Sequence, residues 1–148
     1  MWTAQLERLP TKTKIASWGL NTSLSCAVCL IGIETRDHVL LHCGFAAEKW
    51  RAVFSKLDQY QPPCTPWAEL LSWTRRSTVP APSLLRKVVV QSVLYNIWRQ
   101  RNNVIHNHIL VPARTTFRVI DREVRNILFA RRKRRKFKNL LLLACLSL

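Results

Sequence analysis

Residues 26–43 read CAVCLIGIETRDHVLLHC, a stretch in which cysteine and histidine recur at close spacing. Cys26 and Cys29 are separated by two residues, His38 follows, and Cys43 closes the stretch. Three thiolates and one imidazole are a common donor set for a tetrahedral zinc ion, and a C-x2-C pair supplies two of them from a single turn. We therefore predict a zinc site at Cys26, Cys29, His38 and Cys43, with Cys43 lying just past the end of a short helix.

His42 provides a second donor set. His38 and His42 are four residues apart and share a face if both lie on one α-helix, whereas the adjacent His42 and Cys43 are not expected to bind the same ion. The set Cys26, Cys29, His38 and His42 therefore stays open, as does an interpretation without metal. Either set fills all four positions with protein atoms, so we expect a structural ion and no catalytic one.

The charge balance points to a polyanionic partner. The chain has 148 residues, with 24 Lys and Arg against 8 Asp and Glu, and a formal net charge of +16. A compact protein with this excess repels itself, so we expect RNA or DNA first and an anionic membrane surface second. No apolar run approaches the roughly 20 residues of a membrane span. Of the two candidates we keep nucleic acid, and our prediction is RNA or DNA as the partner, without a membrane or a small-molecule substrate.

The five cysteines favour a reducing compartment. Residues 1–10, MWTAQLERLP, lack the basic start and apolar stretch of a secretory signal. Clustered cysteines in a reducing compartment more often hold metal than form disulfides, and we expect Cys64 and Cys145 to be incidental thiols. Together with the basic composition, this favours the nucleus.

Hydrophobic periodicity and helix caps predict a mainly α fold. We expect a small zinc-stapled N-terminal helical module, then a helix, then a long antiparallel helical hairpin joined at residues 110–114. The predicted helices cover residues 11–19, 36–41 with Thr35 as N-cap, 46–57, 66–76 after Thr65, 84–109 with Ser83 as N-cap, and 116–138.

The expected core follows from the helical spacing. We expect Trp18 and Trp50 to pack around the zinc turn, and Trp73 to lie off the buried face of its helix. The other expected core residues are Val53, Phe54, Leu57, Trp67, Leu70, Leu71, Leu84, Val88, Val90, Leu94, Ile97, Trp98, Ile105, Ile120, Val124, Ile127, Leu128 and Phe137.

Residues 131–138, RRKRRKFK, hold the densest charge in the chain. Arg114, Arg118, Arg122 and Arg125 precede them at steps of three or four residues, which predicts a basic stripe along one helix. Such a stripe suits a phosphate backbone, and the predicted contacts are Arg118, Arg122, Arg125, Arg131, Arg132, Lys133, Arg134, Arg135, Lys136 and Lys138. The alternative is a solvated helix face that serves as a nuclear-import signal. Arg99 and Arg101, beside Trp98, are further candidates for stacking on bases.

Several short runs carry a resemblance to a known family. They are RLPTK (8–12), WGLN (18–21), CAVC (26–29), ETRDHVL (34–40), Cys43 and EKW (48–50). This pattern resembles the zinc-binding domain of plant LINE-type (non-LTR) retrotransposon reverse transcriptases, over about residues 2–60. The runs IWRQRNN (97–103) and FRVID (117–121) resemble the segment that follows this domain. The resemblance favours Cys43 over His42 and implies a position C-terminal to the polymerase, which becomes a candidate partner.

The resemblance also suggests how the chain is divided. We expect a reverse-transcriptase-type zinc-binding domain at residues 1–60, Pro-containing linkers around a short helix at 61–82, and a basic helical hairpin at 83–148. The run of residues 140–148 matches nothing expected of such a segment.

Polymerase chemistry does not follow from this resemblance. It needs paired carboxylates that hold two metal ions, and the acidic residues here are scattered singly. We therefore predict a zinc-binding, nucleic-acid-binding module without enzymatic activity. The alternatives are a zinc-stapled protein–protein docking module and a retroelement fragment without function.

Overall fold

The computed structural model describes residues 2–58, 66–140 and 143, and it is mainly helical, as predicted. The α-helices are α1 (Trp2–Gln5), α2 (Lys12–Ser17), α3 (Gly44–Leu57), α4 (Trp67–Arg75), α5 (Ser83–Asn107) and α6 (Ala113–Ala130). A π-helical turn, η1 (His38–His42), precedes α3, and a 3-10 turn, η2 (Arg135–Phe137), follows α6. Extended pairing within the described ranges is limited to a bridge between Ser25 and Ile33.

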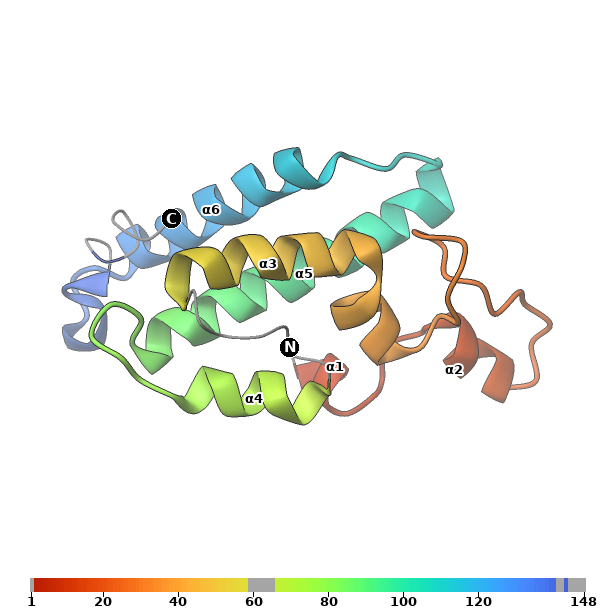
Figure 1. Cartoon of the computed structure of the whole chain (residues 1–148), viewed down its shortest axis with the longest axis horizontal. Coiled ribbons are helices and arrows are strands. Elements are labelled where there is room, and N and C mark those ends of the chain that lie inside the picture. Colours follow the sequence, from red (N-terminus) through yellow and green to blue (C-terminus); the bar gives the residue numbers. More distant parts are fainter. Residues whose placement is uncertain (1, 59–65, 141–142, 144–148) are drawn as a thin grey trace.

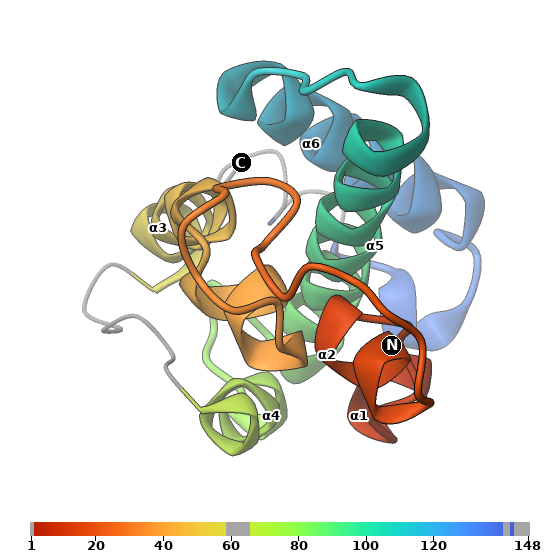
Figure 2. The same ribbon diagram turned by 90° about the vertical axis from the view of Figure 1, so that its right-hand side faces the viewer.

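The long helix α5 runs through the middle of the molecule, with α3, α4, α6 and η1 packed around it (Figures 1 and 2). Because neighbours surround it, Val88, Val89 and Val90 are all buried in succession, which one apolar stripe does not allow. The predicted core, which included Val88 and Val90 but not Val89, was therefore too narrow for this helix. The predicted cap was also wrong, because Pro82 takes the N-cap position and the Ser83 hydroxyl donates to the Thr74 carbonyl at 2.8 Å. Helix α6 returns antiparallel to α5, which confirms the hairpin.

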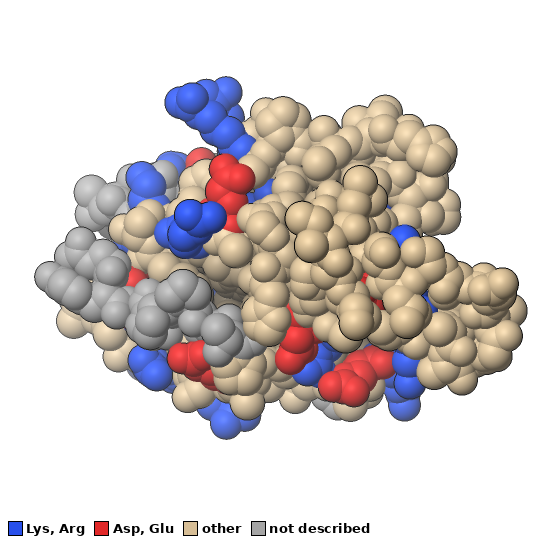
Figure 3. Space-filling model, turned by 45° about the vertical axis from the view of Figure 1, so that its right-hand side comes forward, with Lys and Arg blue, Asp and Glu red and all other residues tan. Residues whose placement is uncertain are grey.

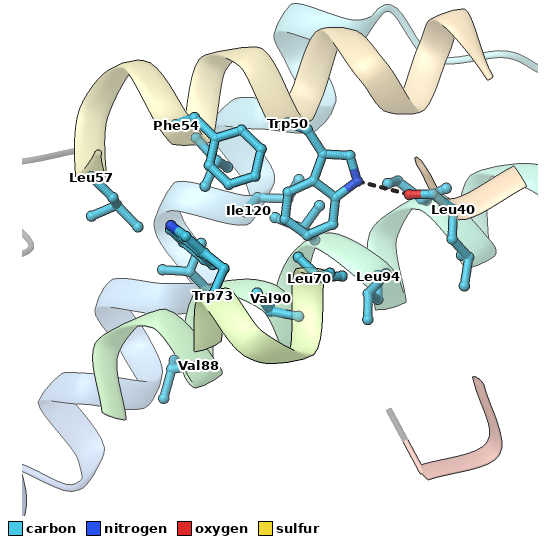
Figure 4. Packing of buried hydrophobic residues seen from close by; sticks show 14 of the residues in the cluster. Leu40, Trp50, Phe54, Leu57, Leu70, Trp73, Val88, Val90, Leu94 and Ile120 are labelled. Atoms are coloured by element: carbon cyan, nitrogen blue, oxygen red, sulfur yellow. Dashed lines mark hydrogen bonds between the residues drawn. The ribbon is translucent and has the colours of Figure 1, made fainter. Parts of the chain in front are cut away.

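Helix α4 packs against α5 and contacts α3 through Trp73, and this position buries Trp73 completely (Figure 4). The expectation that Trp73 lies off the buried face was wrong because α4 contacts two neighbours. The Trp73 ring contacts the Phe54 ring edge to face, with the two centroids 5.0 Å apart. Arg86 lies 4.6 Å above the same ring and pairs with Asp58, which also accepts from the Trp73 indole at 3.2 Å. These contacts fix α4 against α3 and α5.

The basic run does not continue α6. The helix ends at Ala130, and a turn leads into η2, which contradicts the predicted helix to Lys138. Like charges three and four residues apart disfavour a helix, and the turn lets Phe137 and Leu140 reach the core, where each is 6% exposed. The run is therefore a folded-back segment pinned by two apolar side chains.

The buried apolar side chains form one continuous core from Ala4 to Leu140. The division at residues 60 and 82 stays a prediction. Of the expected features, Cys64, Cys145, Thr65 and most of the 140–148 run lie outside the described residues. Within the described ranges, no helix combines the length and apolar character needed to cross a membrane.

Candidate metal centre

The structure brings Cys26, Cys29, His38 and Cys43 to one point. One donor atom from each residue lies within 4.8 Å of the other three. The Cys29 sulfur and His38 Nε2 are 3.2 Å apart. Zn–S bonds of about 2.3 Å imply tetrahedral ligand separations of about 3.7 Å, so the site closes around one ion when the wider separations shorten and the Cys29–His38 separation lengthens slightly. The chain thus has a Cys3His cluster positioned to hold a metal ion.

A tight loop presents the first two cysteines. The Cys26 carbonyl accepts from Leu30 N at 2.9 Å, and Cys26 N donates to the Gly32 carbonyl at 2.7 Å. Leu30 adopts a left-handed conformation, with φ of 62°, which turns the chain back toward Ile33. These bonds direct both thiols of the C-x2-C pair to the same side.

The π-helical turn brings His38 and Cys43 together. In a π-turn the bond runs from residue i+5 to residue i, and Cys43 N donates to the His38 carbonyl at 2.6 Å. A separation of five residues therefore equals one turn here, although it would not align two residues on an α-helix. His42 is exposed and outside the cluster, and Cys43 follows the turn as predicted. The Thr35 hydroxyl caps the turn by accepting from His38 N at 3.1 Å.

Gly32 is a feature that the sequence analysis missed. A Cβ at this position would overlap the His38 ring. The ring packs directly on the loop that carries the two cysteines, and only glycine leaves space for it. In the sequence, the glycine three residues after Cys29 was the signal that another group packs closely on this loop.

Before metal binds, a hydrogen bond couples the buried thiols of Cys26 and Cys43. The hydrogen bond from Cys43 lowers the pKa of Cys26 to about 4. That bond, together with burial, raises the pKa of Cys43, which keeps its proton. Zinc binds thiolates and releases thiol protons, so loading this site expels the proton from Cys43.

Lys49 supplies a positive charge close to the cluster. Three thiolates and a neutral imidazole leave a net negative charge around a divalent ion. Lys49 is buried on α3, and its ammonium donates to the Phe45 carbonyl at 3.1 Å. Burial lowers the pKa of Lys49 to about 8, while negative charge on Glu48, and on the Cys43 sulfur once it is a thiolate, acts to raise it. The ammonium is thus placed to offset the charge of the loaded site.

A buried ion pair ties the metal loop to α5. Glu34 is fully buried, and its Oε1 accepts from Arg101 Nη2 at 2.6 Å and from Lys12 N at 2.9 Å. Its Oε2 accepts from Ala27 N at 2.9 Å, inside the C-x2-C loop. Arg101 also donates to the Pro10 carbonyl at 3.1 Å. One carboxylate thereby joins the cysteine loop, the start of α2 and the central helix.

The buried ion pair of Glu34 and Arg101 shows that one predicted nucleic-acid contact, Arg101, was wrong. Arg101 is 4% exposed, so it is not available to nucleic acid, whereas Arg99 is exposed. Arg101 also lies 4.7 Å above the Trp98 ring, which is partly buried against the core.

Trp50 is buried beside the metal site, where its indole donates to the Leu40 carbonyl at 2.7 Å (Figure 4). Trp18 is 58% exposed, so its predicted packing around the turn was wrong.

The predicted phosphate contacts are mostly on the surface. Arg125 is half-buried and pairs with Asp121 at 3.0 Å, one turn earlier on α6. The other nine are exposed: Arg118, Arg122, Arg131, Arg132, Lys133, Arg134, Arg135, Lys136 and Lys138. They lie along α6 and beyond its C-terminal end, whereas the metal loop lies at the other end of the molecule (Figure 1).

Residues 1–50 match a protein-family model described as zinc-binding in reverse transcriptase. The matched segment covers all four donors and ends within α3. No curated protein and no solved structure matches the chain. The match identifies a zinc-binding segment and no catalytic domain, and the cluster supplies a donor set that suits zinc.

Proposed function

We propose that this chain is a zinc-stapled nucleic-acid-binding module from the C-terminal part of a non-LTR retrotransposon reverse transcriptase of the plant LINE type. It acts in the nucleus and contacts the phosphates of RNA or DNA without catalysing a reaction. The match over residues 1–50 supports the reverse-transcriptase origin. Among the described residues, the potential metal ligands gather at the Cys3His site.

The exposed basic run carries this proposal. Residues 131–136 are all exposed cations, and Lys138 adds another beyond the buried Phe137. The core contacts of Phe137 and Leu140 hold the run against the body of the protein. Arg114, Arg118 and Arg122 extend the charge along α6. In Figure 3, Lys and Arg lie mainly toward the left and lower edges, while the face in front is largely uncharged. The concentration of exposed cations at residues 131–138 suits a polyanion.

Replacing Lys133, Arg134 and Lys136 together by Gln is expected to weaken RNA and DNA binding. Removing one phosphate contact reduces the slope of log affinity against log salt by about 0.9 for duplex DNA. The slope of the triple variant should therefore be smaller by about 2–3 units in a gel-shift titration across salt.

The matched control removes the same charge from other exposed positions, Arg8, Lys14 and Arg51. This variant should change the slope much less than the first. Equal slopes for the two variants would show that binding depends on net charge alone and not on the basic run. Absence of binding by the native protein at low salt would refute the proposed function.

A second candidate function rests on the opposite end of the molecule. Residues 15–33 contain no charged residue, although the chain carries 24 Lys and Arg. The exposed apolar side chains of this segment are Trp18, Leu20, Leu24, Leu30, Ile31 and Ile33, with Ile31 92% exposed. Clustered apolar surface of this kind marks protein interfaces. We propose that this surface docks onto the polymerase part of the parent enzyme.

Docking of this kind should be insensitive to salt, because no charges take part. We expect the separately expressed polymerase part to bind the native chain and to bind a Leu30→Asp, Ile31→Asp variant about tenfold more weakly. A sedimentation titration at low and high salt measures both effects. Equal affinity of the two chains would eliminate this candidate and leave the nucleic-acid proposal intact.

A further inference from the structure

An exposed aromatic ring lies at the edge of the basic run. Phe129 occupies the last turn of α6, immediately before residues 131–136, and it is 52% exposed. The core positions of this helix are Ile120, Val124 and Leu128, which lie on another face. Phe129 is therefore not required for packing of the helix, and its ring stands among groups suited to bind phosphate.

Arg132 holds this ring in place. Its guanidinium carbon lies 3.8 Å from the Phe129 ring centroid, and its Nη1 donates to the Phe129 carbonyl at 2.8 Å. The guanidinium thus lies over the ring, and the two groups form a contacting pair on the surface. Phe129 keeps half of its surface exposed beside Arg132, and Arg132 is itself exposed, so the pair is open to solvent.

We propose that Phe129 and Arg132 form a stacking platform for an unpaired base, so that the chain prefers single-stranded over double-stranded nucleic acid. This inference rests on the proposed function and specifies its substrate class. Aromatic and guanidinium planes stack on any base, and neighbouring cations hold the backbone that carries it. In a duplex the base faces are already stacked on each other, and exposing one requires unstacking. The platform therefore stabilises only single-stranded ligands.

The test compares affinities of the whole chain for a labelled single strand of about 16 nucleotides, near the upper size of known single-strand sites, and for a duplex of equal length. Phe129→Ala should weaken single-strand binding about tenfold and leave duplex binding unchanged. Phe129→Trp should restore single-strand affinity, because stacking and not the phenyl group itself is required. Fluorescence anisotropy measures each case.

Tyr95→Ala is the matched control, since Tyr95 is an exposed aromatic residue on α5 with 57% of its surface accessible. It should affect neither ligand. If Phe129→Ala lost affinity equally for both ligands, or for neither, the stacking platform would be overturned. The proposed function would still stand in that case, provided that the native chain bound nucleic acid. Failure of the native chain to bind either ligand at low salt would overturn both.

Discussion

Replacing Arg101 by Leu is expected to destabilise the protein by about 3–5 kcal/mol, because the variant leaves the Glu34 carboxylate buried without its partner. Glu34 has no exposed surface and Arg101 is 4% exposed, so water cannot solvate the remaining charge. For a chain of this size the loss corresponds to a melting temperature lowered by about 10 °C or more. Thermal unfolding followed by circular dichroism, with zinc present throughout, measures the effect.

The ion pair between Asp121 and Arg125 serves as the comparison, and Asp121→Ala removes it. These two residues are four apart on α6 and partly exposed, and such pairs contribute about 0.3–0.5 kcal/mol. The double variant Glu34→Met, Arg101→Leu should be more stable than Arg101→Leu alone, because it removes the uncompensated charge. A loss below about 1 kcal/mol for Arg101→Leu would show that the pair is not effectively buried.

This prediction bears on how the chain is divided. The carboxylate of Glu34 bonds the cysteine loop, and its partner belongs to α5, 67 residues further along the chain. If the pair has the expected effect, the metal loop and the central helix stabilise each other. We then expect residues 1–60 expressed alone to be less stable than the same residues in the whole chain, although they include the complete donor set.

The donor set could be predicted from the sequence because metal ligation constrains residue types and spacing directly. The choice between His42 and Cys43 could not be derived from α-helical geometry, since the answer depends on a π-turn that no local preference of these residues indicates. Its hydrogen bond, from Cys43 N to the His38 carbonyl, makes a separation of five residues equal to one turn.

Long-range contacts account for the other positions at which the structure differs from the predictions made from the sequence. Trp73 and Arg101 are buried because elements distant in sequence pack on them, which a helical period cannot reveal. Charge density was the wrong guide for the 131–138 segment, where two apolar residues determine the path of the chain. Glu34 had a weak signal that went unused. It is an acidic residue between Ile33 and Thr35, within the segment that carries the four metal donors.

Replacing Cys43 by Ser is expected to abolish stoichiometric zinc binding, whereas His42→Ala should retain it. The Cys43 sulfur belongs to the cluster, while His42 is exposed and outside it. Structural zinc contributes on the order of 10 kcal/mol or more of binding free energy that is linked to folding. Metal analysis of the purified proteins, together with unfolding in the presence and absence of a chelator, measures both properties.

The native chain and His42→Ala should each contain about one zinc ion, as expected for a single tetrahedral site, and both should lose stability when a chelator is added. Cys43→Ser should contain little zinc and respond weakly to the chelator, because it has no tightly held ion to lose. Cys26→Ser should behave in the same way, since it removes another thiolate from the same cluster. Zinc retained by Cys43→Ser but lost by His42→Ala would reverse the ligand assignment. A metal-free native chain that stays folded with the chelator would eliminate the zinc centre, and with it the physical reason for the shape of residues 26–43.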